Sequence, residues 1–239
     1  DIVVLAIGED YDYSGEARSR SDIGLPGAQK QLIDALRATG KPIVAVLMNG
    51  RPLALEAALE DIPAVLETWF LGNESGPAIA DILFGEVSPA GRLPMGMPRV
   101  TGQVPQSYAH PPTGRPANPD LSIDSARYSD TAIGPLFPFG HGLSYATFDY
   151  SALEILPQGD GRSLRWAVSA TVKNTGARDA DEVIQLYIRA PVSGLARPVK
   201  ELRGFARVSI PAGETRRVTF VLRPEQFGIW RDGWHIPAG

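Results

Sequence analysis

A polar segment near the start of the chain carries the residue types that acid–base chemistry needs. It follows an apolar run, IVVLAIG, and reads YDYSGEARSRSDIGLPGAQ at positions 11–29. Five carboxylates lie in or beside it: Glu9, Asp10, Asp12, Glu16 and Asp22. Carboxyl groups can donate or accept protons and can attack an electrophilic carbon. The segment therefore predicts either an acid–base site or a solvated polar loop. Glu16 is its most conspicuous carboxylate, because it lies between small residues and is followed by Arg18 and Arg20.

Other chemistries find little support in the sequence. The chain has no cysteine, which excludes disulfides, thiolate metal sites and a cysteine nucleophile. His110, His141 and His235 stand singly, without the spacing that binds a metal. No phosphate-binding loop or GxGxxG motif follows the first apolar run, and GHGLS at 140–144 lacks the Gly-x-Ser-x-Gly order of a hydrolase elbow. We therefore expect neither a metal nor a cofactor.

Composition and charge restrict the partners. The net charge is −4, which argues against nucleic acid, and no run approaches the roughly 20 apolar residues that cross a membrane. Residues 1–145 carry a net charge of −7 and residues 146–239 of +3. This change of sign favours two domains.

The first part of the chain alternates apolar strands with helical patterns. DIVVLAIGE predicts a fully buried strand, PGAQKQLIDALRATG a helix with an apolar face of Ala28, Leu32, Ala35 and Leu36, and KPIVAVLMNG a second buried strand. A short helix (51–61), a third strand (62–70) and another helix (74–86) follow. This alternation predicts a mostly parallel sheet with helices on both faces, which binds ligands at the carboxyl ends of its strands. The 11–29 segment and Asn49–Gly50–Arg51 lie at such ends. Three strands make a thin core, so further strands are expected before Asp1.

After residue 100 the sequence no longer alternates between strand and helix patterns. Residues 101–146 are rich in proline and glycine and predict an irregular linker. From residue 147 the hydrophobic period is two, in five short segments separated by turn residues, which predicts an all-β sandwich of immunoglobulin or fibronectin III type. We therefore assign residues 1–100 to an α/β sandwich domain, 101–146 to the linker, and 147–239 to a β-sandwich that is cut short at its C-terminal end.

Four blocks resemble glycoside hydrolase family 3, in particular its bacterial β-glucosidases. They are SGEARSRSDIGLPGAQKQLIDAL, KPIVAVLMNGRPLAL, AVLETWFLGNESGPAIADILFGEVSPAGRLPMGMPR and GPLFPFGHGLSYATF, in the family's order. The tail VKNTGARDADEVIQLYI…RPVKELRGFARV resembles the fibronectin III-like domain that often accompanies them. The resemblance covers essentially the whole chain. It implies an α/β sandwich followed by a fibronectin III-like domain, whereas the family's N-terminal (β/α)8 barrel has no counterpart here.

The resemblance also implies the roles of individual residues. The family retains anomeric configuration, with an Asp nucleophile on the barrel and a Glu general acid/base on a loop of the second domain. The motif places the acid/base at Glu16 of SGEARSR, with Glu9 of GED as the alternative, and the nucleophile is not in this chain. Retaining hydrolysis needs its two carboxyl groups roughly 5–5.5 Å apart.

The residues around Glu16 can be assigned supporting roles. A cation that touched Glu16 would hold it ionised. We therefore expect Arg18 and Arg20 to point away, with Arg20 bracing the loop by binding carboxylates such as Asp22 or backbone carbonyls. Tyr11 and Tyr13 are candidate contacts for a sugar beyond the cleaved bond.

The resulting prediction is part of an exo-acting retaining β-glycosidase that removes terminal non-reducing β-D-glucosyl residues from cellobiose or aryl β-glucosides. The partner is the N-terminal barrel of the same polypeptide, and the isolated chain is expected to be inactive. The alternatives are a β-xylosidase of the same family and a non-catalytic carbohydrate-binding or scaffold module. The resemblance also suggests a periplasmic or secreted protein and a homodimer, with the cytoplasm left open.

Overall fold

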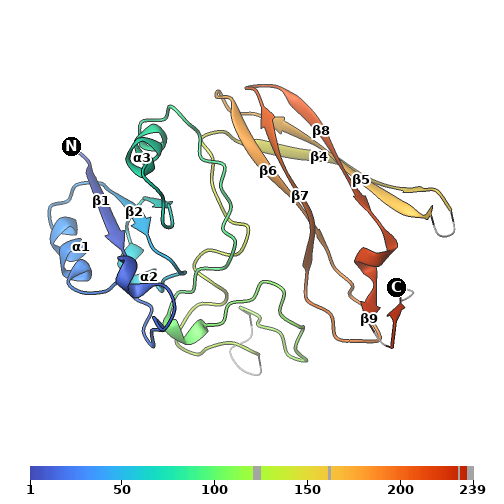
Figure 1. The fold of residues 1–239 in the computed structure, drawn as a ribbon, viewed down its shortest axis with the longest axis horizontal. Helices are drawn as coiled ribbons and strands as arrows, with labels where there is room; N and C mark the ends of the chain where they lie inside the picture. The colour runs from blue at the N-terminus through green and yellow to red at the C-terminus, as the bar shows by residue number, and fades with distance from the viewer. Residues whose placement is uncertain (121–124, 161–162, 231, 236–239) are drawn as a thin grey trace. The chain divides into compact units, whose positions relative to one another are not determined.

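The computed structural model describes residues 1–120, 125–160, 163–230 and 232–235, and it divides into two compact units (Figure 1). Unit 1 comprises Asp1–Leu83, Leu93–Ser107 and Arg115–His141; unit 2 comprises Phe84–Arg92, Tyr108–Gly114 and Gly142–Gly239. The predicted linker, residues 101–146, is thus shared between the units, and its residues 121–124 lie outside the described residues. The same holds for residues 236–239 of the predicted β-sandwich.

Unit 1 contains a parallel sheet in the order β1 (Val3–Gly8), β2 (Ile43–Met48) and β3 (Ala64–Glu67). The helices α1 (Gln29–Arg37), α2 (Glu56–Leu59) and α3 (Ser75–Leu83) alternate with these strands, and short 3₁₀ turns occur at Tyr11–Tyr13 and Thr101–Gln103. The predicted α/β class is confirmed. The third strand has four residues where nine were predicted, because only Ala64–Glu67 pairs with β2.

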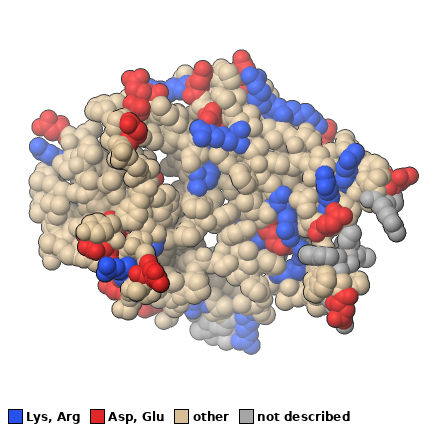
Figure 2. Space-filling model, in the orientation of Figure 1, with Lys and Arg blue, Asp and Glu red and all other residues tan. Residues whose placement is uncertain are grey.

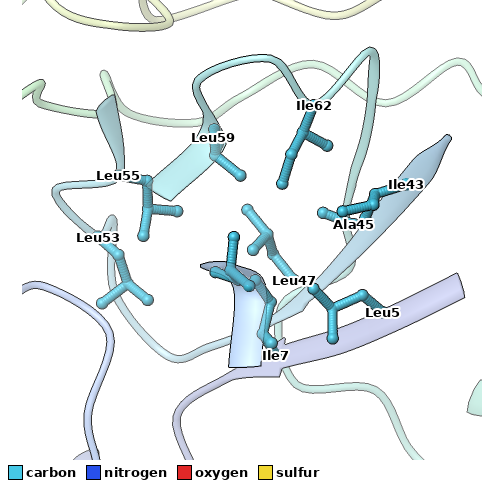
Figure 3. Close-up of a cluster of buried hydrophobic side chains, with 10 residues drawn as sticks. Leu5, Ile7, Ile43, Ala45, Leu47, Leu53, Leu55, Leu59 and Ile62 are labelled. Atoms are coloured by element: carbon cyan, nitrogen blue, oxygen red, sulfur yellow. The ribbon is translucent and has the colours of Figure 1, made fainter. Parts of the chain in front are cut away.

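The core of unit 1 lies on one face of this sheet (Figure 3). Alternate residues of β1 and β2, together with Ile33 of α1 and the segment around α2, supply its buried side chains: Leu5, Ile7, Ile33, Ile43, Ala45, Leu47, Leu53, Leu55, Leu59 and Ile62. Burial of one such leucine or isoleucine stabilises the fold by about 1.5–3 kcal/mol. This packing therefore holds β1 and β2 in place up to their carboxyl ends.

Two predictions about this core need correction. The predicted apolar face of α1 is rotated: Leu36 packs against the core cluster, whereas Leu32 is 48% exposed and Ile33, outside the predicted face, is fully buried. Gln29 explains the rotation: its amide both accepts from the Gly8 N–H and donates to the Gly8 carbonyl, each at 2.8 Å, which fixes the helix against the end of β1. The strand β1 is buried on one side only, because side chains alternate and Val4, on the face opposite the core cluster, is 58% exposed.

Unit 2 is an antiparallel β-structure. One sheet has the order β4 (Phe148–Gln158), β5 (Arg165–Asn174) and β8 (Thr215–Leu222), and β6 (Ala180–Ile188) pairs with β7 (Glu201–Ile210). A 3₁₀ turn at Pro224–Phe227 leads to the pair β9 (Ile229–Trp230) and β10 (Trp234–His235). Val172, Ile184 and Ile210 form the buried centre between the two sheets. The five predicted strands and the all-β sandwich class are confirmed.

Charges of both signs occur across the face drawn in Figure 2, where Lys and Arg are interspersed with Asp and Glu. This mixture accords with the small net charge of −4. No helix in the parts of the chain that the structure describes is long and apolar enough to cross a membrane.

Candidate active site

The three parallel strands end at one edge of the sheet and deliver polar residues there. Glu9 follows β1, Asn49 follows β2, and Glu67 is the last residue of β3. Glu9 and Asn49 are buried, at 5% and 0% exposure. Since ligands bind at the carboxyl ends of parallel strands, this edge is the candidate site, and the segment predicted from the sequence begins at it.

Glu9 is a structural carboxylate. Its side chain is 0% exposed, and its two oxygens accept from Arg20 Nη1 at 2.7 Å and from Arg51 Nε at 3.3 Å. Arginine donors thus occupy both oxygens of a side chain that solvent does not reach. The geometry therefore argues against Glu9 as the acid.

Glu16 lies at the tip of the loop that follows. The Tyr11–Tyr13 turn begins with Asp10, whose carboxylate accepts from the Asp12 N–H at 2.8 Å, and a second turn joins the Arg18 N–H to the Gly15 carbonyl at 3.3 Å. The Glu16 side chain is exposed, and it takes part in no hydrogen bond or ion pair within the described residues. Ala17 beside it has a φ of +57°, uncommon for a residue with a side chain and typical of functional loops.

The neighbouring arginines are engaged away from Glu16, in line with the expectation from the sequence. Arg18 pairs with Asp12 at 3.5 Å, and Arg20 binds Glu9 and the Gly24 carbonyl, the latter at 3.0 Å. Arg20 thus contacts one carboxylate, Glu9, and one backbone carbonyl, and its role in supporting the loop stays a prediction.

Asp22, named above as an example of such a carboxylate, has other partners. Its Oδ1 accepts from the Gly24 N–H at 2.9 Å and from the Thr101 hydroxyl at 3.3 Å, so it stabilises the turn after the loop. Short-range hydrogen bonds of this kind are typical of aspartate in turns.

The two tyrosines predicted to contact a sugar differ in their surroundings. Tyr13 is half-buried under the Arg20 guanidinium, whose carbon lies 5.2 Å from the ring centre. Tyr11 is 82% exposed. Only Tyr11 thus presents a largely open ring beside the loop, and the role of both residues stays a prediction.

Three further residues at this edge received no role from the sequence. Arg51 donates to the backbone carbonyls of Tyr13 and Arg18, the latter at 2.9 Å. Asn49 donates to the Arg51 carbonyl at 2.9 Å and to Glu67 at 3.3 Å. The position of the Asn49–Arg51 stretch after a buried strand was the available signal, but its long-range partners depend on the tertiary fold.

The Glu67 carboxyl at this edge has a perturbed pKa. Burial raises its pKa to about 7, against the opposing effect of hydrogen bonds from the Trp69 N–H at 2.9 Å and from Asn49. Its hydrogen-bond donors in the described structure are neutral, unlike those of Glu9. Glu67 therefore titrates close to neutral pH.

Comparison with known proteins identifies the family. The model of the glycosyl hydrolase family 3 C-terminal domain matches residues 1–145, and that of the fibronectin type III-like domain matches residues 182–239. The chain is 46% identical, over 96% of its length, to the periplasmic β-glucosidase of Salmonella typhimurium and 41% identical, over 96%, to a β-xylosidase of Formosa agariphila. It spans only 30% and 31% of those two proteins.

Solved structures agree in fold. The β-glucosidase of Listeria innocua in complex with isofagomine superposes with a TM-score of 0.91 at 41% identity, covering 97% of this chain and 32% of that one. The complex of the same enzyme with glucose gives a TM-score of 0.90, covering 95% of this chain and 32% of that one at 41% identity. The chain belongs to glycoside hydrolase family 3 and corresponds to the C-terminal portion of its members.

Proposed function

We propose that this chain supplies the general acid/base of a retaining, exo-acting β-glycosidase, with Glu16 in that role. The substrates are terminal non-reducing β-D-glucosyl residues, as in cellobiose or aryl β-glucosides. The nucleophile is an aspartate on an N-terminal (β/α)8 barrel of the same polypeptide. Family membership and the β-glucosidases among the relatives support this proposal.

The observation that carries the proposal is the freedom of the Glu16 carboxylate. It is exposed at the tip of a braced loop, while Arg18 and Arg20 are paired with Asp12 and Glu9. A carboxyl that alternates between proton donor and acceptor needs access to substrate and must avoid a permanent cationic partner. Glu16 meets both requirements.

The chemistry then runs in two steps. The aspartate attacks the anomeric carbon while Glu16 transfers its proton to the leaving oxygen, and a covalent glycosyl-enzyme forms. The Glu16 carboxylate next removes a proton from water, whose oxygen attacks the same carbon and releases the sugar. Neither step requires a metal or cofactor.

A β-xylosidase is the second candidate, favoured by the 41% identity to the Formosa protein of that name. Assays with both aryl glycosides separate the two. A non-catalytic carbohydrate-binding or scaffold module is the third reading, which the braced acid loop opposes. We further propose a periplasmic or secreted location, supported by the periplasmic Salmonella relative.

The test is hydrolysis of p-nitrophenyl β-D-glucoside by the complete enzyme that contains this chain, with Glu16→Ala beside the wild type. We expect Glu16→Ala to lower kcat by about 10²–10⁴-fold, the usual contribution of a general acid or base. Added azide, which needs no general base, should restore turnover and yield a glycosyl azide.

The control is Glu86→Ala, which removes an exposed carboxylate from unit 2 and should leave kcat unchanged. Near-normal activity of Glu16→Ala would refute the acid/base assignment. An inactive wild type would instead support the non-catalytic module, and faster hydrolysis of the xyloside would select the second candidate.

A further inference from the structure

We propose that Arg51 is a positioning residue that holds the Glu16 loop in one conformation, an inference that rests on the proposed function of Glu16. Its Nη2 donates to the backbone carbonyls of Tyr13 and Arg18, the latter at 2.9 Å. One carbonyl precedes Glu16 in the chain and the other follows it. A single guanidinium therefore joins the two legs of the loop.

The same guanidinium is anchored to the sheet. Its Nε lies 3.3 Å from Glu9 Oε2, and the other Glu9 oxygen binds Arg20. Glu9 is the first residue after β1, and its side chain is fully buried. The legs of the loop are thus connected through Arg51 to the rigid end of a strand.

Residues at the ends of β2 and β3 hold the backbone of Arg51 in place. The fully buried Asn49 donates to the Arg51 carbonyl at 2.9 Å and to Glu67 at 3.3 Å. At Gly50 the chain approaches the loop so closely that a Cβ would lie 2.2 Å from the Ser14 hydroxyl. Arg51 therefore acts on the loop from a separate, well-supported element.

The loop depends on such support because Glu16 contributes none. Its side chain has no hydrogen-bond or ion-pair partner in the part of the chain that the structure describes, so the backbone alone sets its position. A guanidinium can serve two carbonyls and a carboxylate at once through its fixed fork of donors, which an amide or an ammonium cannot reproduce. A displacement of about 1 Å in a catalytic group can cost about 10²-fold in rate.

The test compares leaving groups in the complete enzyme. A general acid matters most for a poor leaving group, so kcat/KM is measured with phenyl and 2,4-dinitrophenyl β-D-glucosides for the wild type, Arg51→Gln and Arg51→Lys. We expect Arg51→Gln to lose about 10²-fold with the phenyl glucoside and less than about tenfold with the dinitrophenyl glucoside. Arg51→Lys should show the same inequality to a smaller degree.

Arg37→Gln is the matched control. Arg37 also donates to backbone carbonyls, those of Ala57, Ala58 and Glu60, and its side chain is 26% exposed against 23% for Arg51. This variant should keep the wild-type ratio between the two substrates. Melting temperatures recorded in parallel separate a loss of stability from a loss of positioning, and Arg51→Lys carries the comparison if Arg51→Gln does not fold.

Equal losses with both substrates, or no loss, would overturn the proposal for Arg51. If Glu16→Ala is slow while the Arg51 variants keep the wild-type ratio, only the positioning role fails. If Glu16→Ala is active, the proposed function itself fails. The two failures are therefore distinguishable.

Discussion

Among the residues that the structure describes, each unit buries one glutamate whose two oxygens are both occupied. In unit 1, Glu9 accepts from Arg20 at 2.7 Å and from Arg51 at 3.3 Å. In unit 2, Glu182 of β6 accepts from Arg92 at 2.6 Å and from the Tyr150 hydroxyl at 2.8 Å. Burial and the bond to Glu182 raise the pKa of Tyr150 above its usual range, so this donor keeps its proton.

The two sites differ in what else the donors to each glutamate contact. Tyr150 belongs to β4, and Arg92 binds the carbonyls of Ala90 and Gly91 in its own segment, so Glu182 joins structural elements to one another. The two arginines that bind Glu9 also donate to backbone carbonyls of the segment that carries the exposed Glu16. Arg20 donates to Gly24, and Arg51 donates to Tyr13 and Arg18. Similar ion pairs thus connect structural elements in one unit and, under the proposed function, support the loop of Glu16 in the other.

The largest effect that tests this comparison is expected from Glu9→Gln. Removing one partner of a buried ion pair costs about 3–5 kcal/mol, because the remaining charges stay desolvated. We expect a loss of stability of this size, together with a loss of β-glycosidase activity per folded molecule. Scanning calorimetry and an active-site titration of the complete enzyme measure the two quantities.

Glu182→Gln is the control for that variant. It should destabilise unit 2 through the same mechanism and leave activity per folded molecule unchanged. A loss of activity in both variants would show that the two buried glutamates do not differ in function.

A smaller effect is expected from Gly50→Ala. The added Cβ would meet Ser14 Oγ at 2.2 Å and the Phe70 ring at 2.7 Å, so the side chains of Ser14 and Phe70 must move. We expect kcat/KM to fall by up to about 10²-fold, the cost of a displacement near 1 Å. Gly72→Ala, where the added Cβ has no atom within 4 Å, should retain activity. Equal activity of the two variants would contradict a loop placed by close packing against β2.

The smallest effect is a change in how stability depends on pH, and it is expected at Glu67. In the described residues Glu67 has only neutral hydrogen-bond donors, whereas Glu9 and Glu182 each bind at least one arginine. Burial raises its pKa from 4.5 to about 7. Between these values the folded state holds a proton that the unfolded state has released, so the free energy of unfolding falls as pH rises. We expect Glu67→Gln to lose less stability than the wild type between pH 5 and pH 8.

Urea unfolding at the two pH values measures this effect, with the exposed Glu60→Gln as control. The control should follow the wild type. If Glu67→Gln also follows it, the carboxyl does not titrate near neutral pH.

Much of the fold was accessible from the sequence. Strand–helix alternation predicted the parallel sheet, and a period of two predicted β4 to β8, because these periodicities reflect how each element buries one face. The rotation of α1 was not accessible. It depends on a bond between Gln29 and Gly8, 21 positions apart, and hydrophobic spacing within the helix carries no information about that contact.

For the candidate site, one short segment of the sequence was enough to nominate the acid/base residue of the proposed function. A glutamate between Gly15 and Ala17, after a strand that ends at a sheet edge, together with the resemblance of the surrounding motif, singled out Glu16. The sequence left open whether Arg18 or Arg20 contacts its carboxylate. The answer depends on contacts made in the folded chain: the fold brings the buried Glu9 to Arg20, Asp12 to Arg18, and Arg51 to the loop carbonyls. Arg51 lies 42 positions from Glu9, and the parallel pairing of β1 with β2 brings the two together.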